Sequence, residues 1–227
     1  MVQDMQSGRE TISVADQARM AFIFSLRERG ISSLPVLRAL ETVPRELFVP
    51  HRYVDLAWKD IALPIACGQT MPQPDLLARM LSALDIAPDH RILEIGSGSG
   101  YAAAVMSRIC AQVLTLERFR PLQAEASVRL ARLGFDNINC IWADGLDSGM
   151  TGQGADGPWD RIVIHGAVDE VPQHLSQRLV PGGFILFARR PQPDGQGAGA
   201  IWLAQPPAQP AFLCPGHFTA LIAGRSA

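Results

Sequence analysis

Short apolar runs and amphipathic stretches alternate along the second half of the chain. The apolar runs are as long as buried strands, and apolar residues at helical spacing fill the stretches between several of them. This alternation predicts a parallel sheet with helices on both faces. The predicted strands cover residues 91–95, 111–117, 137–142, 160–165 and 184–188, and the predicted helices 100–110, 121–133 and 172–179.

The first 85 residues have a different pattern. Apolar side chains at helical spacing predict helices over 16–29, 34–43 and 76–84. Between the last two lies an apolar loop rich in proline and glycine, residues 60–74, which must pack onto another part of the protein. We therefore expect a helical cap with a substrate or cofactor loop in residues 1–85, joined in one compact unit to an α/β domain in residues 86–227.

The last 37 residues contain two further apolar runs, at 201–203 and 218–223. We expect them to form an antiparallel pair at the sheet edge. With the five parallel strands they complete a doubly wound, mostly parallel, seven-stranded sheet.

Composition narrows the classes of function. The 227 residues are 48% hydrophobic and 19% charged, as in a globular protein, and a net charge of -2 provides no basic face for nucleic acid. The four cysteines form no CxxC pair, and no His/Cys/Asp cluster has metal-ligand spacing. No run is long enough to span a membrane, and the N-terminus has no secretory pattern. We expect a cytoplasmic protein without metal, nucleic-acid or membrane partners.

The most informative stretch is residues 91–101, RILEIGSGSGY. A strand, a glycine turn and a helix follow one another, which lets backbone N–H groups approach a ligand. The spacing is GxGxG, and Tyr101 replaces the third glycine of a dinucleotide fingerprint, GxGxxG. A nicotinamide oxidoreductase is therefore disfavoured. The Walker pattern GxxxxGK is also absent, so a pyrophosphate or triphosphate ligand is disfavoured as well.

An acid ends the next predicted strand. Glu117 follows Glu94 by 23 residues, a position from which a carboxylate can accept hydrogen bonds from ribose hydroxyls. Gly96, Asp144 and His165 also fall at carboxyl ends of predicted strands, where ligands bind in such sheets. The glycine turn with the later acid resembles the S-adenosylmethionine site of class I methyltransferases, whose sheet is Rossmann-like.

Several motifs together resemble the protein-L-isoaspartate O-methyltransferase family over residues 16–190. The GxGxG box occurs in many methyltransferases, whereas the first two of the following motifs are much more specific. The motifs are VPRELFVP at 43–50, LPI at 63–65 with GQTMPQP at 68–74, LEIGSGSGY at 93–101, LG at 133–134 with Asn137, DG at 144–145 and PGG at 181–183.

The resemblance implies methyl transfer from S-adenosylmethionine to the α-carboxyl of isoaspartyl residues in damaged proteins or peptides. By resemblance, Gly96, Ser97 and Gly98 line the methionine and ribose, and Glu117 holds the ribose hydroxyls. Asp144 and Gly145 meet the adenine, while Thr70 and Met71 lie beside the cofactor near the substrate. Gln69, Glu94 and Arg118 complete the implied cofactor-binding set.

One departure concerns the candidate catalytic loop. Pro72 stands where the family has a serine regarded as an active-site residue, and proline has neither a hydroxyl nor an N–H to donate. Thr70 and His165 are the other candidate catalytic residues. His165 either replaces the missing donor or forms a structural hydrogen bond beside the cofactor. Two alternatives follow: a methyltransferase of the same fold with a changed substrate, and a cofactor-binding protein without transfer activity.

Overall fold

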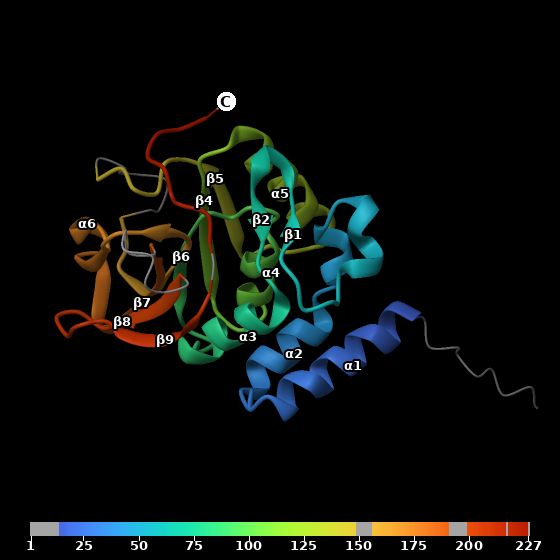
Figure 1. The fold of residues 1–227 in the computed structure, drawn as a ribbon. Coiled ribbons are helices and arrows are strands. Elements are labelled where there is room, and N and C mark those ends of the chain that lie inside the picture. The colour runs from blue at the N-terminus through green and yellow to red at the C-terminus, as the bar shows by residue number, and fades with distance from the viewer. Residues whose placement is uncertain (1–13, 149–155, 191–198, 217, 227) are drawn as a thin grey trace, which may run out of the picture.

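The computed structural model describes residues 14–148, 156–190, 199–216 and 218–226, and its centre is a seven-stranded sheet (Figure 1). The strand order is β5-β4-β3-β6-β7-β8-β9. The first five are parallel, and β8 is antiparallel to both β7 and β9. The strands are β3 (Arg91–Ile95), β4 (Gln112–Glu117), β5 (Ile138–Trp142), β6 (Trp159–Val168), β7 (Leu179–Arg189), β8 (Ala200–Ala204) and β9 (Ala211–Pro215). The predicted mostly parallel, seven-stranded sheet is confirmed.

Side chains of the central strands alternate between two hydrophobic clusters. Ile92 and Val163 belong to the larger cluster, and Leu93 and Ile162 to the smaller one. Successive residues of a strand point to opposite faces, so each face of the sheet forms one core. Both faces are covered, which explains why the sequence shows continuous apolar runs there.

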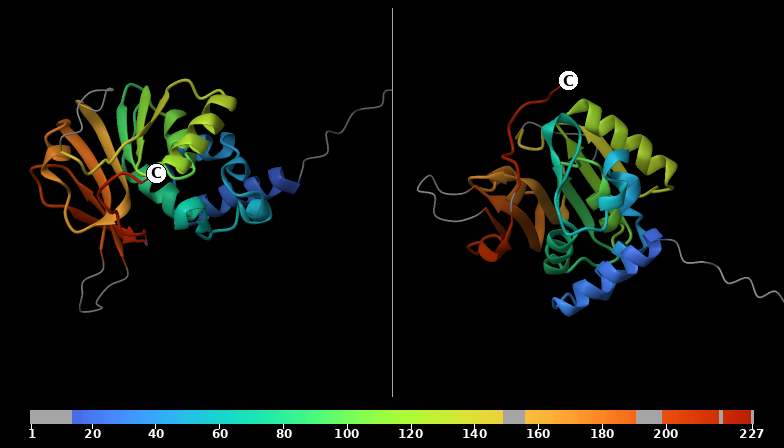
Figure 2. Two further views of the ribbon diagram at one scale, coloured as in Figure 1. Left: turned by 90° about the horizontal axis from the view of Figure 1, so that it is seen from above. Right: turned by 45° about the vertical axis from the view of Figure 1, so that its right-hand side comes forward.

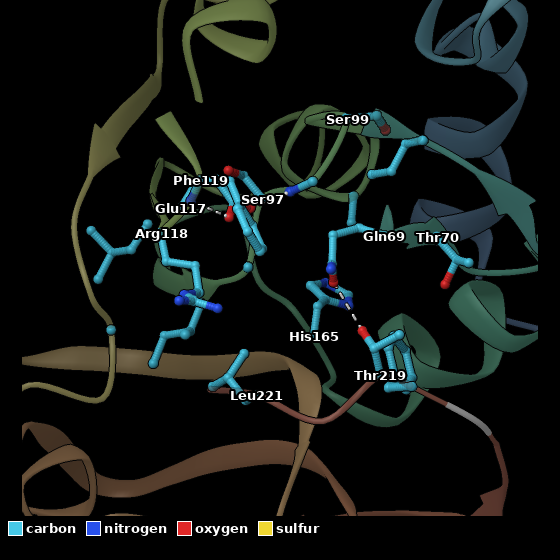
Figure 3. Close-up of a pocket in the computed structure, with 18 of the residues that line it drawn as sticks. Gln69, Thr70, Ser97, Ser99, Glu117, Arg118, Phe119, His165, Thr219 and Leu221 are labelled. Carbon is cyan, nitrogen blue, oxygen red and sulfur yellow. Dashed lines mark hydrogen bonds between the residues drawn. The ribbon is translucent and has the colours of Figure 1, made fainter. Parts of the chain in front are cut away.

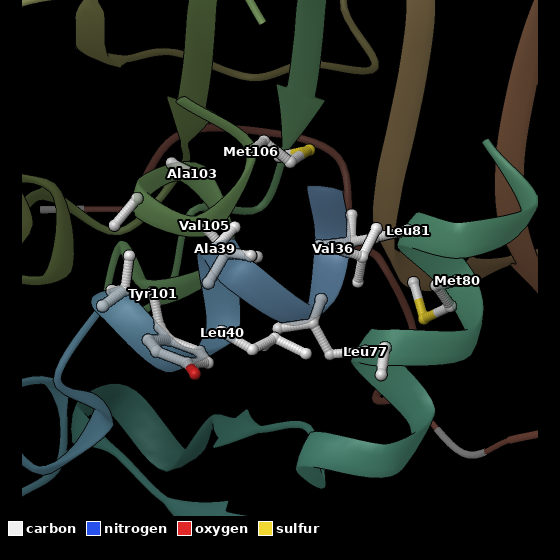
Figure 4. Packing of buried hydrophobic residues seen from close by; sticks show 14 of the residues in the cluster. Val36, Ala39, Leu40, Leu77, Met80, Leu81, Tyr101, Ala103, Val105 and Met106 are labelled. Atoms are coloured by element: carbon white, nitrogen blue, oxygen red, sulfur yellow. The ribbon is translucent and has the colours of Figure 1, made fainter. Parts of the chain in front are cut away.

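Helices α1 to α5 supply side chains to the larger cluster and lie on one side of the sheet (Figure 2). In Figure 4, Ala39 and Leu40 of α2 lie near Val105 and Tyr101 of α4, and Val36 of α2 lies beside Leu81 of α3. On the other face, α6 contributes the buried Leu175. The helices are α1 (Val14–Glu28), α2 (Leu34–Thr42), α3 (Pro74–Ala83), α4 (Tyr101–Ser107), α5 (Arg120–Arg132) and α6 (Gln173–Ser176).

The segment between α2 and α3 has more structure than the sequence predicted. It contains two 3-10 helices, η1 (Arg45–Phe48) and η2 (His51–Leu56), and then a two-stranded hairpin. The hairpin pairs β1 (Leu63–Pro64) with β2 (Thr70–Met71) around η3 (Ala66–Gly68). As expected of so apolar a loop, the hairpin packs inward, burying Leu63 and Met71.

The prediction of a second closing strand at residues 218–223 is wrong. The sheet is instead completed by β9, and residues 218–226 run back over the carboxyl ends of the parallel strands as a strap. Isolated bridges join Ala220 of the strap to Ala167, and Ser226 to Phe119. Phe218 and Leu221 of the strap are half-buried and line a pocket, whereas Ile222 is 60% exposed.

The division of the chain at residues 85 and 86 stays a prediction, although side chains from both parts share the larger cluster. Among the described residues, no helix is long and apolar enough to cross a membrane. In the same residues, no three His, Cys, Asp or Glu side chains gather where they could hold a metal ion.

Candidate functional site

A pocket opens beyond the carboxyl ends of β3, β4 and β6 (Figure 3). It encloses roughly 960 Å³ of space between protein atoms, its mouth included. Its walls come from the glycine turn after β3, the end of β4, the β1–β2 hairpin and the strap. Of the predicted site residues, it brings together Gln69, Thr70, Met71, Pro72, Gly96, Ser97, Gly98, Glu117, Arg118, Asp144, Gly145 and His165.

The glycine turn presents bare backbone to this pocket. Gly96 and Gly98 have φ angles of +91° and +52°, a region that L side chains rarely adopt. A Cβ on Gly96 would lie 3.1 Å from the carbonyl oxygen of His165, and one on Gly98 would lie 3.1 Å from Ile65. The N–H of Gly96 donates to the Leu116 carbonyl at 2.7 Å, which ties the turn to β4. A ligand can therefore approach the main chain closely here.

Glu117 is held by backbone donors at the tip of β4. One carboxylate oxygen accepts from the N–H of Gly98 at 2.9 Å, and the other accepts from the N–H of Phe119 at 2.9 Å. Burial raises the pKa of Glu117, and these hydrogen bonds oppose the shift. Each oxygen still has a lone pair for a hydroxyl group, as the predicted ribose contact requires.

The loop after β5 closes another side of the pocket. A Cβ on Gly145 would lie only 2.5 Å from Cγ2 of Ile95, so only glycine lets this loop pack on β3. Asp144 accepts from the N–H of Leu146 at 2.9 Å and from the N–H of Gly224 in the strap at 2.6 Å. The Asp144 carboxylate therefore joins the loop to the strap beside the pocket.

A buried arginine anchors the main chain next to the β1–β2 hairpin. Arg45, fully shielded from solvent, donates from Nε to the Ala57 carbonyl and from an Nη to the Pro72 carbonyl, both at 2.8 Å. Its guanidinium lies 5.0 Å from the ring centre of Tyr101, and burial lowers its pKa. The main chain at Pro72 is thus anchored, although its side chain has no hydrogen-bond donor.

Glu94 does not line the pocket, in contrast to the cofactor-binding role that the resemblance implies. Its side chain is fully buried behind the wall. Its Oε1 lies 3.0 Å from Nε2 of His165, which does line the pocket. Any influence of Glu94 on a bound ligand therefore passes through neighbouring groups such as His165.

Sequence reasoning missed much of the wall. Phe119 and Ile65 line the pocket, as do residues 218–222 of the strap. Across the mouth, the Thr219 hydroxyl donates to Oε1 of Gln69 at 3.0 Å. Phe119 follows directly after Glu117, so proximity to the strand tip was a usable signal for it. No local pattern signals the path of the strap.

The fold and this pocket define the class of protein. A glycine turn follows the first parallel strand, a buried acid ends the next strand, and the pocket between them lies at the carboxyl edge of the sheet. These are the features of a Rossmann-like, class I methyltransferase.

Comparisons with known proteins identify the family within that class. The sequence model of the family described as protein-L-isoaspartate(D-aspartate) O-methyltransferase (PCMT) matches residues 17–192. The protein-L-isoaspartate O-methyltransferase of Azorhizobium caulinodans is 51% identical over 177 residues, which cover 78% of this chain and 80% of that protein. The corresponding protein of Nitrobacter winogradskyi is 44% identical over 178 residues, with coverage of 78% and 80%. This chain belongs to the protein-L-isoaspartate(D-aspartate) O-methyltransferase family.

Solved structures agree on the fold. A Plasmodium falciparum protein described as a protein-L-isoaspartate O-methyltransferase, solved in complex with S-adenosyl-L-homocysteine, superposes with a TM-score of 0.76 at 20% identity. The alignment covers 90% of this chain and 98% of that one. A second protein-L-isoaspartate O-methyltransferase gives a TM-score of 0.74 at 26% identity, with coverage of 89% and 65%.

Proposed function

We propose that this protein transfers a methyl group from S-adenosylmethionine to the α-carboxyl of L-isoaspartyl residues in damaged proteins or peptides. The observation that carries the proposal is the family match, which spans residues 17–192 and so includes the glycine turn, the β4 tip and the hairpin. The predicted resemblance and the matched family agree.

The pocket suits the cofactor at three places. Gly96 and Gly98 line the pocket with main chain that carries no side chain, which suits the methionine and ribose portions. Glu117 is positioned for the ribose hydroxyls, and Asp144 and Gly145 border the place for the adenine. Gln69, Thr70 and Met71 lie at the hairpin end, which we assign to the methyl acceptor. Arg118 lies at the rim.

The reaction requires little acid–base catalysis by the protein. S-adenosylmethionine supplies an electrophilic methyl group, and a carboxylate acceptor, with an ordinary pKa of roughly 4, is already ionised at neutral pH. No general base is needed, so the protein contributes alignment and exclusion of water. The hairpin and the strap meet through Gln69 and Thr219 and form the walls that perform both tasks.

The test is transfer of labelled methyl groups from S-adenosylmethionine to an isoaspartyl peptide, with the matching aspartyl peptide as control. We expect label in the isoaspartyl peptide alone, and base-labile label, because an ester forms. Cofactor binding by calorimetry without transfer to either peptide would refute the proposed acceptor while leaving the cofactor site intact.

A further inference from the structure

His165 and Glu94 form a buried pair at the acceptor end of the pocket. In the register of β3 with β6, Glu94 lies opposite Val163, so Glu94 and His165 share a face of the sheet. The His165 side chain is 7% exposed and that of Glu94 is 0% exposed. The other Glu94 oxygen, Oε2, accepts a hydrogen bond from the Thr115 hydroxyl. The β3 and β4 strands thus fix the carboxylate that faces the imidazole.

Among the ion pairs of the described residues, Glu94 pairs with His165 alone. A buried carboxylate is costly unless a cation or several hydrogen bonds compensate it. Nε2 of His165 lies 3.0 Å from Oε1 of Glu94, so an N–H on Nε2 faces the carboxylate. This close approach does not have hydrogen-bond geometry, and Nδ1 of His165 is likewise buried without a hydrogen-bond partner among the described residues.

The position of His165 in the pocket gives this donor a use. Figure 3 shows Glu117 and Phe119 on one side of the pocket, and His165 with Gln69 and Thr219 on the other. The charged side chains that line the pocket, Glu117, Arg118 and Asp144, belong to the nucleoside side. His165 is therefore the cationic candidate at the side assigned to the acceptor.

We propose that His165, oriented by its close approach to Glu94, binds the α-carboxylate of the isoaspartyl residue through its Nδ1–H. This inference rests on the proposed function, and it assigns to His165 the donor role that Pro72 lacks. His165 transfers no proton: one carboxylate oxygen bonds to the methyl carbon as the bond from that carbon to sulfur breaks. The ester product is neutral and a weaker acceptor than the carboxylate, so the same contact favours product release.

The surroundings of His165 show which group orients it. It faces Glu94 from β3, Gln69 from the hairpin, and Phe218 and Thr219 from the strap, and Glu94 is the charged residue among these. Glu94→Gln removes the carboxylate that faces Nε2 of His165, so the KM for the peptide should increase toward that of His165→Ala.

The test compares His165→Ala, His165→Gln and Glu94→Gln with wild type by initial-rate kinetics on an isoaspartyl peptide. Loss of a hydrogen bond to a charged group corresponds to about 10–100-fold, and we expect this increase in KM for His165→Ala. The kcat should change much less, and the calorimetric Kd for S-adenosylhomocysteine by less than about twofold. His165→Gln keeps a neutral donor, so its KM should lie between those of wild type and His165→Ala.

His90→Gln is the matched control, because His90 precedes the amino end of β3 and the pocket lies beyond the carboxyl ends of the strands. It should keep the wild-type KM. An unchanged KM in folded His165→Ala, or a loss confined to cofactor affinity, would overturn this inference alone. Wild-type protein that binds S-adenosylhomocysteine but methylates no isoaspartyl peptide would overturn the proposed function and this inference with it.

Discussion

Replacing Glu117 by glutamine should impair cofactor binding nearly as much as replacing it by alanine. Both carboxylate oxygens accept backbone N–H groups, one from Gly98 and one from Phe119. An amide has one oxygen and one NH₂ group, so in either orientation its NH₂ faces a backbone donor. Glu117→Gln must therefore rotate away or displace the glycine turn, and in both cases the ribose loses its acceptor.

The magnitude follows from the number of hydrogen bonds. Hydrogen bonds to charged groups contribute about 1.5–3 kcal/mol each, so losing two ribose contacts should cost roughly 3 kcal/mol or more. This corresponds to a Kd increased about 100-fold or more. Calorimetric titration with S-adenosylhomocysteine measures this change, and circular dichroism verifies the fold of each variant.

Glu170→Gln provides the control, because Glu170 is an exposed glutamate outside the pocket and should bind as wild type. A wild-type Kd for Glu117→Gln, with a weakened Glu117→Ala, would refute the argument from the two backbone donors. A wild-type Kd for both variants would refute the placement of the ribose.

Three further predictions concern folding and pH. Arg45→Met should lower the free energy of unfolding by about 2–4 kcal/mol in urea titrations, because it leaves the buried carbonyl of Ala57 and the part-buried carbonyl of Pro72 without a donor. Gly145→Ala should lower both the Tm and the cofactor affinity, because the added Cβ would overlap Ile95. A Tm and an affinity equal to those of wild type would contradict the packing described. Burial raises the pKa of Glu117, so cofactor affinity should fall on acidification at a higher pH than for an ordinary glutamate. The same shift makes the cofactor-free protein more stable as the pH falls through that range, which urea titrations at several pH values can measure.

The sequence predicted best what depends on neighbouring residues. The run from Arg91 to Tyr101 forms its predicted strand, turn and helix, because strand propensity, glycine conformation and helix propensity each act locally. Glu117 was also placed at a strand tip from the sequence, because the preceding apolar run fixes where the strand ends.

The sequence predicted least where long-range packing decides. The apolar run of the strap has the same composition as a strand. The edge position of the sheet is occupied by β9, so the strap lies over the pocket and does not pair as a strand. Arg45 illustrates the same limit, because a charged residue in a short motif gives no sign that its side chain is fully buried. The pairing of Glu94 with His165 depends on the register of β3 with β6, which neither local segment determines.

The strap also affects when the protein can first bind its ligand during folding. All seven strands precede residues 218–226 in the chain, so the sheet can form before the pocket has its last wall. Bound cofactor stabilises only the state with a complete pocket. Stabilisation by S-adenosylmethionine therefore begins after the sheet has folded, and the sheet must persist until then on its two hydrophobic clusters alone.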